Sequence, residues 1–286
     1  GLERMIAYLQ GLSFSETDIA YLEELGYPAD FVAYLKEFKL ELSVKSAKEG
    51  DLVFANEPIV QIEGPLAQCQ LVETAILNIV NFQTLIATKA ARIRSVIEDE
   101  PLLEFGTRRA QEMDAAIWGT RAAVIGGANP TSNVRAGKLF GIPVSGTHAH
   151  SWVMSFDNEL EAFREYARVM PKNCVLLVDT YDITQGIKNA ITVGLEMKER
   201  GETLSAIRID SGDLSWRAKQ ARKMLDEAGL TETGIVLSND LDEYTIKSIK
   251  DSGAQVNSWG VGTKLTTAYD QPALGGVYKL AAKRET

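Results

Sequence analysis

Val-Leu-Leu-Val-Asp-Thr-Tyr-Asp occupies residues 175–182, and Ala-Ile-Arg-Ile-Asp-Ser-Gly-Asp occupies residues 206–213. Each stretch begins with a short apolar run, as a buried strand does, and ends in acids, hydroxyls or glycine. Residues 183–200, which lie between them, have apolar positions at helical spacing. A strand, a helix and a second strand in this order predict two parallel strands whose carboxyl ends carry the polar residues.

The same alternation continues through the chain from residue 101 onward. Strands are predicted at residues 102–105, 143–145, 175–178, 206–209, 235–237, 258–261 and 277–280. Helices are predicted between them at residues 110–125, 158–169, 183–200, 215–227 and 243–251. So many β-α units indicate the α/β class, with a parallel sheet that is closed into a barrel or doubly wound.

The chain before this region has a different pattern. Residues 2–40 read as helices, residues 41–63 alternate as a small antiparallel β piece, and residues 66–97 carry a wide apolar stripe typical of one long helix. We therefore expect a partial N-terminal α+β domain at residues 1–98 and a barrel with the active site at residues 99–286. The chain begins inside a helical pattern without methionine, so we expect both ends to be cut from a longer protein.

Composition narrows the partners and the compartment. The 286 residues carry a formal net charge of −9, which repels a polyanion and argues against nucleic acid as a partner. Cys69 and Cys174 stand apart in apolar stretches, as buried thiols do in a reducing compartment. No apolar run approaches the length of a membrane span. A cytoplasmic protein with no membrane contact is expected.

Acidic residues follow the predicted strands directly. Asp179 and Asp182 come after one strand, and Asp210 and Asp213 come after the next. Carboxylates that meet at one edge of a sheet repel each other unless a cation or a hydroxyl-rich ligand lies between them. Because Asp182 and Asp213 also precede helices and fit the N-cap position, we favour Asp179 and Asp210 as the functional acids.

Other clusters offer groups for an anion or for nucleophilic chemistry. Residues 260–263, Gly-Val-Gly-Thr, resemble a phosphate cradle, although paired glycines also make plain turns. Arg108 and Arg109 follow a strand and a glycine, and one of them is expected to bind a carboxylate or phosphate. His148 and His150 are the only histidines; their spacing is a poor zinc pattern, and a nucleophile or proton carrier is the sharper interpretation.

Together these motifs resemble those of the nicotinate phosphoribosyltransferase family, in the family's order. They are Glu-Phe-Gly-Thr-Arg-Arg at residues 104–109, Gly-Thr-His-Ala-His-Ser at 146–151, Val-Asp-Thr-Tyr-Asp at 178–182, Arg-Ile-Asp-Ser-Gly-Asp at 208–213 and Gly-Val-Gly-Thr-Lys at 260–264. The resemblance implies an irregular parallel β/α barrel of the type II phosphoribosyltransferase kind. It also implies transfer of phosphoribose from 5-phosphoribosyl 1-pyrophosphate to nicotinate, with Mg²⁺, coupled to ATP hydrolysis through a phosphohistidine, in NAD biosynthesis.

The resemblance assigns roles to particular residues. His150 matches the phosphorylated histidine, and Asp179 and Asp210 match the acids that hold ribose hydroxyls and, directly or indirectly, magnesium-bound pyrophosphate. Phe105 and Arg108 match the pair that stacks on the base and binds a phosphate or carboxylate, and Arg208 matches a residue near the pyridine carboxylate or ribose. Asn239, Gly262 and Thr263 match the 5′-phosphate site. Ser211, Gly212 and Gly260 are further expected substrate-binding residues.

Ser132 bears on the choice of pyridine. It stands where related nicotinamide-using enzymes have an acid, and a serine hydroxyl can donate to a carboxylate that an acid would repel. The resemblance therefore favours nicotinate over nicotinamide.

Two alternatives stay open. A quinolinate phosphoribosyltransferase shares the architecture but should carry more basic residues around a dicarboxylate. A truncated, non-catalytic core is the other, because the family's N-terminal motif, with a tyrosine that stacks on the pyridine in the partner subunit, and its C-terminal region are missing here. The resemblance further implies a homodimer in the parent protein.

Overall fold

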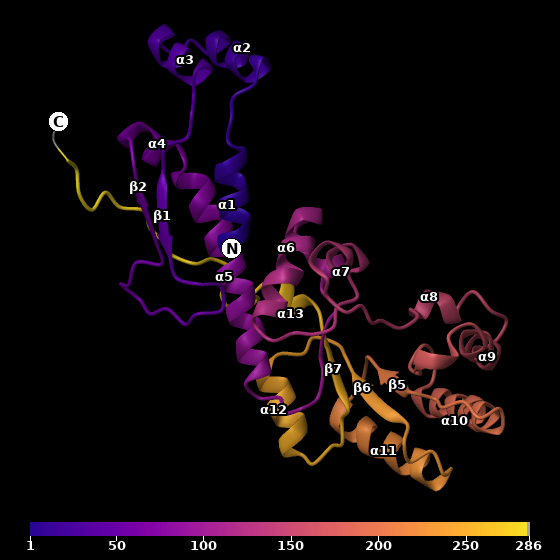
Figure 1. Ribbon diagram of the computed structural model, residues 1–286. Helices are drawn as coiled ribbons and strands as arrows, with labels where there is room; N and C mark the ends of the chain where they lie inside the picture. The colour runs from indigo at the N-terminus through magenta and orange to yellow at the C-terminus, as the bar shows by residue number, and fades with distance from the viewer. Residues whose placement is uncertain (285–286) are drawn as a thin grey trace. The chain divides into compact units, whose positions relative to one another are not determined.

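The computed structural model describes residues 1–284 (Figure 1). Contacts divide the chain into two compact units, Gly1–Thr84 with Ala273–Thr286, and Leu85–Pro272. Each unit is described by itself below. The domain boundary expected between residues 98 and 99 stays a prediction.

The first unit combines short helices with a β-hairpin. Its helices are α1 (Leu2–Gly11), α2 (Glu16–Glu24), α3 (Ala29–Lys36), α4 (Leu66–Leu71) and the beginning of α5 (Glu73–Arg94). Strands β1 (Ser43–Ser46) and β2 (Val60–Glu63) pair antiparallel, so the predicted β piece is confirmed. The single helix expected at residues 66–97 is instead two helices that meet at the buried Val72.

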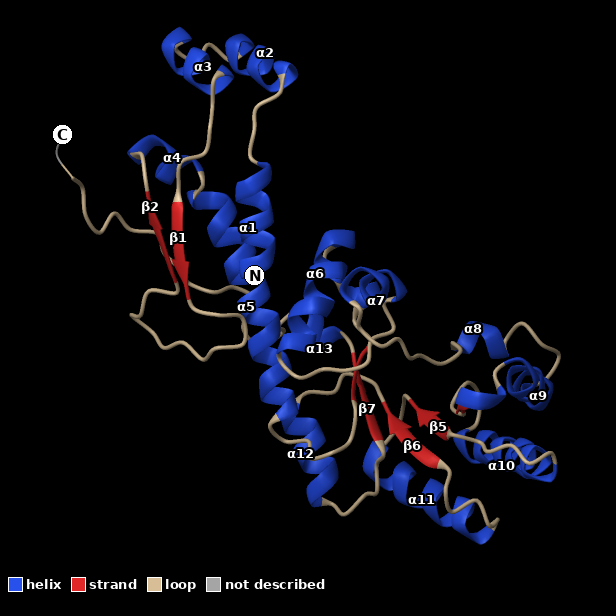
Figure 2. Cartoon of the chain, viewed as in Figure 1, coloured by secondary structure: helices blue, strands red, loops and turns tan. Residues whose placement is uncertain are grey.

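The second unit is built on a parallel sheet of five strands. In spatial order they are β3 (Leu102–Glu104), β7 (Ser258–Val261), β6 (Gly234–Leu237), β5 (Ala206–Ile209) and β4 (Val175–Leu177). Figure 2 shows β5, β6 and β7 side by side, and α10 and α11 pack against β5. The predicted α/β class is confirmed.

Helices connect these strands. They are η1 (Thr107–Arg109), α6 (Glu112–Ile125), α7 (Val134–Phe140), α8 (His150–Val153), α9 (Glu159–Val169), η2 (Pro171–Asn173), α10 (Ile183–Glu199), α11 (Leu214–Glu227), α12 (Glu243–Asp251) and α13 (Thr263–Thr266). The Asp182 and Asp213 carboxylates accept from the backbone N–H groups of Gln185 and Trp216, so both are helix N-caps, as expected.

The strands follow one another around an irregular barrel. The first strand of the unit, β3, pairs with the last, β7. On the other side of β3, single parallel bridges join Glu104 to Thr131 and Thr131 to Val144. The strand expected at residues 143–145 therefore contributes only one isolated bridge. The predicted barrel is confirmed; within residues 1–284 the bridges beyond β3 extend as far as Val144, and no backbone bridge joins Val144 to β4.

The strand expected at residues 277–280 is wrong. This segment is extended but unpaired, belongs to the first unit, and leaves Val277 and Leu280 exposed. Its tie to that unit is a hydrogen bond from the Tyr278 hydroxyl to the Cys69 carbonyl. Alternating apolar residues favour an extended backbone locally, but a strand also needs a partner strand. In the described part of the chain, residues 277–280 have no such partner.

The helices of residues 1–284 include none that is long and apolar enough to cross a membrane.

Candidate active site

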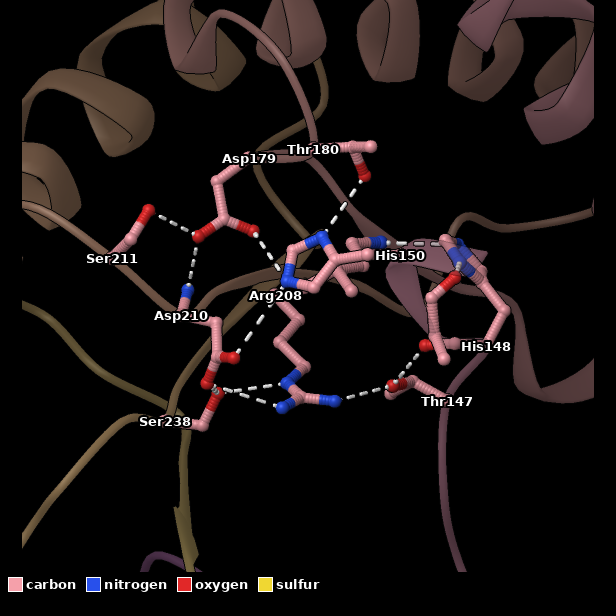
Figure 3. A network of polar contacts seen from close by, with 11 residues as sticks. Thr147, His148, His150, Asp179, Thr180, Arg208, Asp210, Ser211 and Ser238 are labelled. Carbon is pink, nitrogen blue, oxygen red and sulfur yellow. Dashed lines mark hydrogen bonds and ion pairs between the residues drawn. The ribbon is translucent and has the colours of Figure 1, made fainter. Parts of the chain in front are cut away.

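His150, Asp179 and Asp210 come together at the carboxyl ends of the barrel strands (Figure 3). The Nε2 atom of His150 lies 4.0 Å from Asp179 Oδ1 and 3.8 Å from Asp210 Oδ2. Its Nδ1 atom lies 3.1 Å from the Thr180 hydroxyl, within hydrogen-bonding distance. Asp179 and Thr180 follow β4, and Asp210 follows β5, so adjacent parallel strands deliver these groups to one place.

Asp179 is buried, and its two carboxylate oxygens have different surroundings. Oδ2 accepts from the Asp210 backbone N–H at 2.9 Å and from the Ser211 hydroxyl at 2.6 Å. Oδ1 is buried with no hydrogen-bond partner, although it faces His150. A buried acceptor without a partner is costly, so Oδ1 is poised for a ligand hydroxyl or a cation.

Arg208 links the loops on this side of the barrel. Its guanidinium donates to the Ser238 hydroxyl at 2.7 Å, to the Thr147 hydroxyl at 2.9 Å and to Asp210 Oδ1 at 3.2 Å. The Ser238 hydroxyl donates to the same Asp210 oxygen at 2.6 Å. One Asp210 oxygen is therefore fully engaged, which leaves Oδ2 facing His150.

Phe105 brings an aromatic face to this cluster. The Arg208 guanidinium carbon lies 5.3 Å from the ring centroid, a cation–π contact. A β-carbon at Gly260 would lie 2.8 Å from the Phe105 ring, and one at Gly262 would lie 3.0 Å from the Phe105 carbonyl oxygen. Both glycines thus have a packing role that the expected phosphate cradle does not include.

Sequence reasoning missed Glu104, whose carboxylate joins three segments near the site by hydrogen bonds. Its buried carboxylate accepts from the Gly106 N–H at 2.5 Å, the Thr120 hydroxyl at 2.9 Å and the Thr131 hydroxyl at 2.6 Å. The Ser132 N–H donates to the Glu104 carbonyl at 3.0 Å, which places Ser132 beside the end of β3. An acid inside the apolar run at residues 102–105 was the available signal.

The remaining predicted residues lie at other strand ends. Arg108 in η1 and Asn239 after β6 are exposed, and neither makes a polar side-chain contact with the His150–Asp179–Asp210 cluster in the described part of the chain. Gly212 and Asn239 have positive φ angles of 76° and 93°. Thr263 begins α13, and the neighbouring Lys264 is paired with Asp242 at 2.6 Å rather than free for a phosphate.

His148 has a different environment from His150. It is buried against the Phe163 and Tyr166 rings, and its Nε2 accepts from the Leu177 N–H at 3.1 Å. Burial lowers the pKa of His148 to about 4; the charges of Arg208 and His150 act in the same direction, against the Ala149 carbonyl. His148 is therefore neutral at physiological pH, which agrees with its lack of a phosphorylation role in the predicted assignment.

A parallel β/α barrel with acids, an arginine and a histidine at its strand ends defines the class, that of type II phosphoribosyltransferase folds. Residues 1–81 match the model of the nicotinate phosphoribosyltransferase N-terminal domain, and residues 101–283 match that of the nicotinate phosphoribosyltransferase family. The chain belongs to the nicotinate phosphoribosyltransferase family.

Similar proteins agree with this assignment. A nicotinate phosphoribosyltransferase of Bacillus subtilis is 59% identical over all of this chain and 58% of its own length. One of Caenorhabditis elegans is 36% identical, over 99% of this chain and 61% of its own length. The chain thus spans about three fifths of the length of these curated relatives.

Solved structures show the same fold. Human nicotinic acid phosphoribosyltransferase superposes with a TM-score of 0.86 at 30% identity, over 92% of this chain and 64% of its own. A nicotinate-nucleotide pyrophosphorylase of Pyrococcus furiosus superposes with a TM-score of 0.72 at 28% identity, over 84% and 61%.

Proposed function

We propose that this protein transfers the 5-phosphoribosyl group of 5-phosphoribosyl 1-pyrophosphate to nicotinate, giving nicotinate mononucleotide and pyrophosphate for NAD biosynthesis. The observation that carries the proposal is the meeting of His150, Asp179 and Asp210 at the strand ends of a barrel from this family. The names of the relatives support nicotinate as the substrate.

The acids suit the bond changes of this reaction. The C1–O bond of the activated ribose breaks with its electron pair leaving on pyrophosphate, and the nicotinate ring nitrogen supplies the pair for the new C1–N bond. Positive charge develops on the ribose as the old bond breaks, and the carboxylates of Asp179 and Asp210 stabilise it electrostatically. No general base is needed, because the pyridine nitrogen already carries a lone pair.

The same two carboxylates fit Mg²⁺. The unpartnered Asp179 Oδ1 and the inward-facing Asp210 Oδ2 are hard oxygen donors of the kind that this ion prefers. Within residues 1–284, no group of three or more His, Cys, Asp and Glu side chains could hold a metal alone. Mg²⁺ bound by these two carboxylates together with substrate phosphates would stabilise the departing pyrophosphate.

His150 fits the coupling to ATP. When its Nδ1–H donates to the Thr180 hydroxyl, Nε2 carries the lone pair that can attack the γ-phosphorus of ATP as ADP leaves. A phosphoryl group on Nε2 would face two carboxylates, so a cation bound there would offset the repulsion.

The remaining predicted contacts complete the proposal. Phe105, Arg108, Ser132 and Arg208 would receive the pyridine carboxylate and ring, and Ser211, Gly212, Asn239, Gly260, Gly262 and Thr263 would receive the ribose 5-phosphate. We place the enzyme in the cytoplasm as a homodimer; the free thiols Cys69 and Cys174 support a reducing compartment.

The test compares nicotinate, nicotinamide and quinolinate as acceptors with 5-phosphoribosyl 1-pyrophosphate and Mg²⁺, with and without ATP. We expect nicotinate mononucleotide as the product and faster turnover with ATP. We expect His150→Ala to lose the ATP stimulation and the acid-labile phosphoryl group on the protein, while the exposed Lys223→Ala keeps both. Preference for another pyridine would contradict the substrate, and intact ATP coupling in His150→Ala would contradict the histidine's role.

A further inference from the structure

An edge of the barrel wall lies at β4. Even-numbered residues of β4 turn their backbone groups toward β5, as the hydrogen bond from Val178 N–H to the Arg208 carbonyl shows. Odd-numbered residues therefore turn theirs away from β5, toward the side where Val144 is the next element of the ring. Within residues 1–284, no backbone bridge joins Val144 to β4. The Leu177 N–H thus lacks a backbone acceptor in a place where Leu177 is only 1% exposed.

The acceptor that this N–H finds is a side chain. His148 Nε2 lies 3.1 Å from the Leu177 nitrogen, and the His148 ring is 4.7 Å from the Tyr166 ring and 5.8 Å from the Phe163 ring. A buried N–H without an acceptor would destabilise the fold, so the imidazole stabilises an otherwise open edge. The bond requires an unprotonated Nε2, hence the neutral ring with its proton on Nδ1.

His148 belongs to the loop that carries His150. Three side chains of this loop reach three parts of the barrel: Thr147 accepts from Arg208 of β5, His148 accepts from Leu177 of β4, and His150 contacts Thr180 after β4 (Figure 3). Of the three, His148 alone is buried, and it stands two residues before the proposed nucleophile. Because the His148 ring is held in place, the start of α8 is held as well, and His150 is the first residue of that helix.

We propose that His148 is a positioning residue: its imidazole replaces the missing strand pair at the edge of β4 and so holds His150 against Asp179 and Asp210. The consequence for turnover rests on the proposed function, whereas the hydrogen bond and its effect on the His150 ring do not. The proposed function assigns nicotinate and ATP to other groups, so on that proposal His148 acts on their reaction only through the geometry of His150.

Two variants distinguish the effect of the His148 hydrogen-bond acceptor from that of its aromatic ring. His148→Phe keeps an aromatic ring between Phe163 and Tyr166 but leaves the Leu177 N–H without an acceptor. His148→Gln gives up the ring but can place its Oε1 near the position of Nε2. Thermal unfolding shows whether each variant is folded. If a variant is unfolded, the wild-type NMR spectrum described next still decides whether the hydrogen bond exists.

The primary experiment is long-range ¹H–¹⁵N NMR of the imidazoles, which is simplified because the chain has two histidines. In the wild type we expect one neutral His148 tautomer between about pH 5.5 and 8, with a coupling across the hydrogen bond to the Leu177 amide nitrogen. His148→Phe should raise amide exchange at Leu177 at least about tenfold and shift or broaden the His150 signals, and His148→Gln should restore both.

A wild-type His148 that titrates in this range, with no coupling to Leu177, would overturn the hydrogen bond. Unchanged His150 signals in His148→Phe, despite faster exchange at Leu177, would overturn the positioning role. In the turnover assay we expect His148→Phe to lower kcat on the order of tenfold while KM for nicotinate stays within about twofold of the wild-type value. We expect His148→Gln to recover most of the lost kcat. An inactive wild type would contradict the proposed function while leaving the NMR result to judge His148.

Discussion

Glu159 illustrates how strongly burial between helices alters the titration of a single residue. It is the first residue of α9 and is 6% exposed; Oε2 accepts from the Asn189 amide at 2.9 Å, and Oε1 is buried without a partner. Burial raises the pKa of Glu159, the Asn189 hydrogen bond opposes this rise, and the charges of Asp179 and Asp182 add to it. The folded protein therefore holds a proton on Glu159 at pH values where the unfolded chain has lost it.

This shift predicts a pH-dependent stability. Because the folded-state pKa is above the unfolded value of 4.5, the free energy of unfolding falls as the pH rises through the folded pKa. Glu159→Gln, which resembles the protonated acid, should remove this dependence and equal or exceed the wild type in stability near pH 7. Urea unfolding between about pH 4 and 8 measures this, with the exposed Glu161→Gln of the same helix turn as the control. A Glu159→Gln protein less stable than wild type at pH 7 would contradict the argument.

Individual residues differ in how far their sequence context reveals them. Asp182 and Asp213 were predictable as N-caps because capping depends on the three residues that follow. The role of Glu104 was not, because its partners Thr120 and Thr131 are 16 and 27 residues away in the sequence. The same holds for His148, whose acceptor role depends on the edge of a strand 29 residues later.

At the scale of elements, the end of β7 and the end of β3 are fitted to each other through glycine. An alanine at Gly260 would place its Cβ 2.8 Å from the Phe105 ring, and Ser238 Cβ would lie 3.2 Å away on another side. We expect Gly260→Ala to destabilise the protein by about 1–3 kcal/mol and to weaken nicotinate binding, because the ring must move from Arg208. Urea unfolding and the KM for nicotinate measure the two effects.

The matched control is Gly275→Ala, because an added Cβ at Gly275 would meet no atom within 4 Å and the backbone there needs no positive φ. Equal stability and equal KM in both variants would show that Phe105 tolerates displacement and that the glycine is there for another reason.

Helices and strands also differ in how well local patterns predict them. The helices α9, α10, α11 and α12 begin and end within a residue or two of their predicted bounds, since 3.6-residue periodicity and caps are local signals. The strand expected at residues 277–280 is wrong, and residues 143–145 form one isolated bridge instead of a strand. Strand pairing depends on neighbours that are distant in the sequence.

At the scale of the whole molecule, the pairing of the first strand of the barrel with the last is the feature that the sequence did not contain in local form. Pairing of β3 with β7 joins residues more than 150 positions apart, Leu102 with Trp259 among them. The alternation of strands and helices was compatible with a doubly wound sheet as well as with a barrel. The resemblance of the motifs to a known family implied the barrel. Placing acids, glycines and histidine after strands was enough to locate the candidate site, because all carboxyl ends of a parallel barrel meet at one face.

The central claim is that the unpartnered carboxylate oxygen of Asp179 meets the reacting ribose or its metal ion. The most direct measurement is kcat/KM for nicotinate in Asp179→Asn, compared with Asp182→Asn in the same loop. Asparagine keeps the N-cap at residue 182, so we predict wild-type turnover within about threefold there, and a loss of about a hundredfold or more in Asp179→Asn. Equal activity in the two variants would contradict the claim.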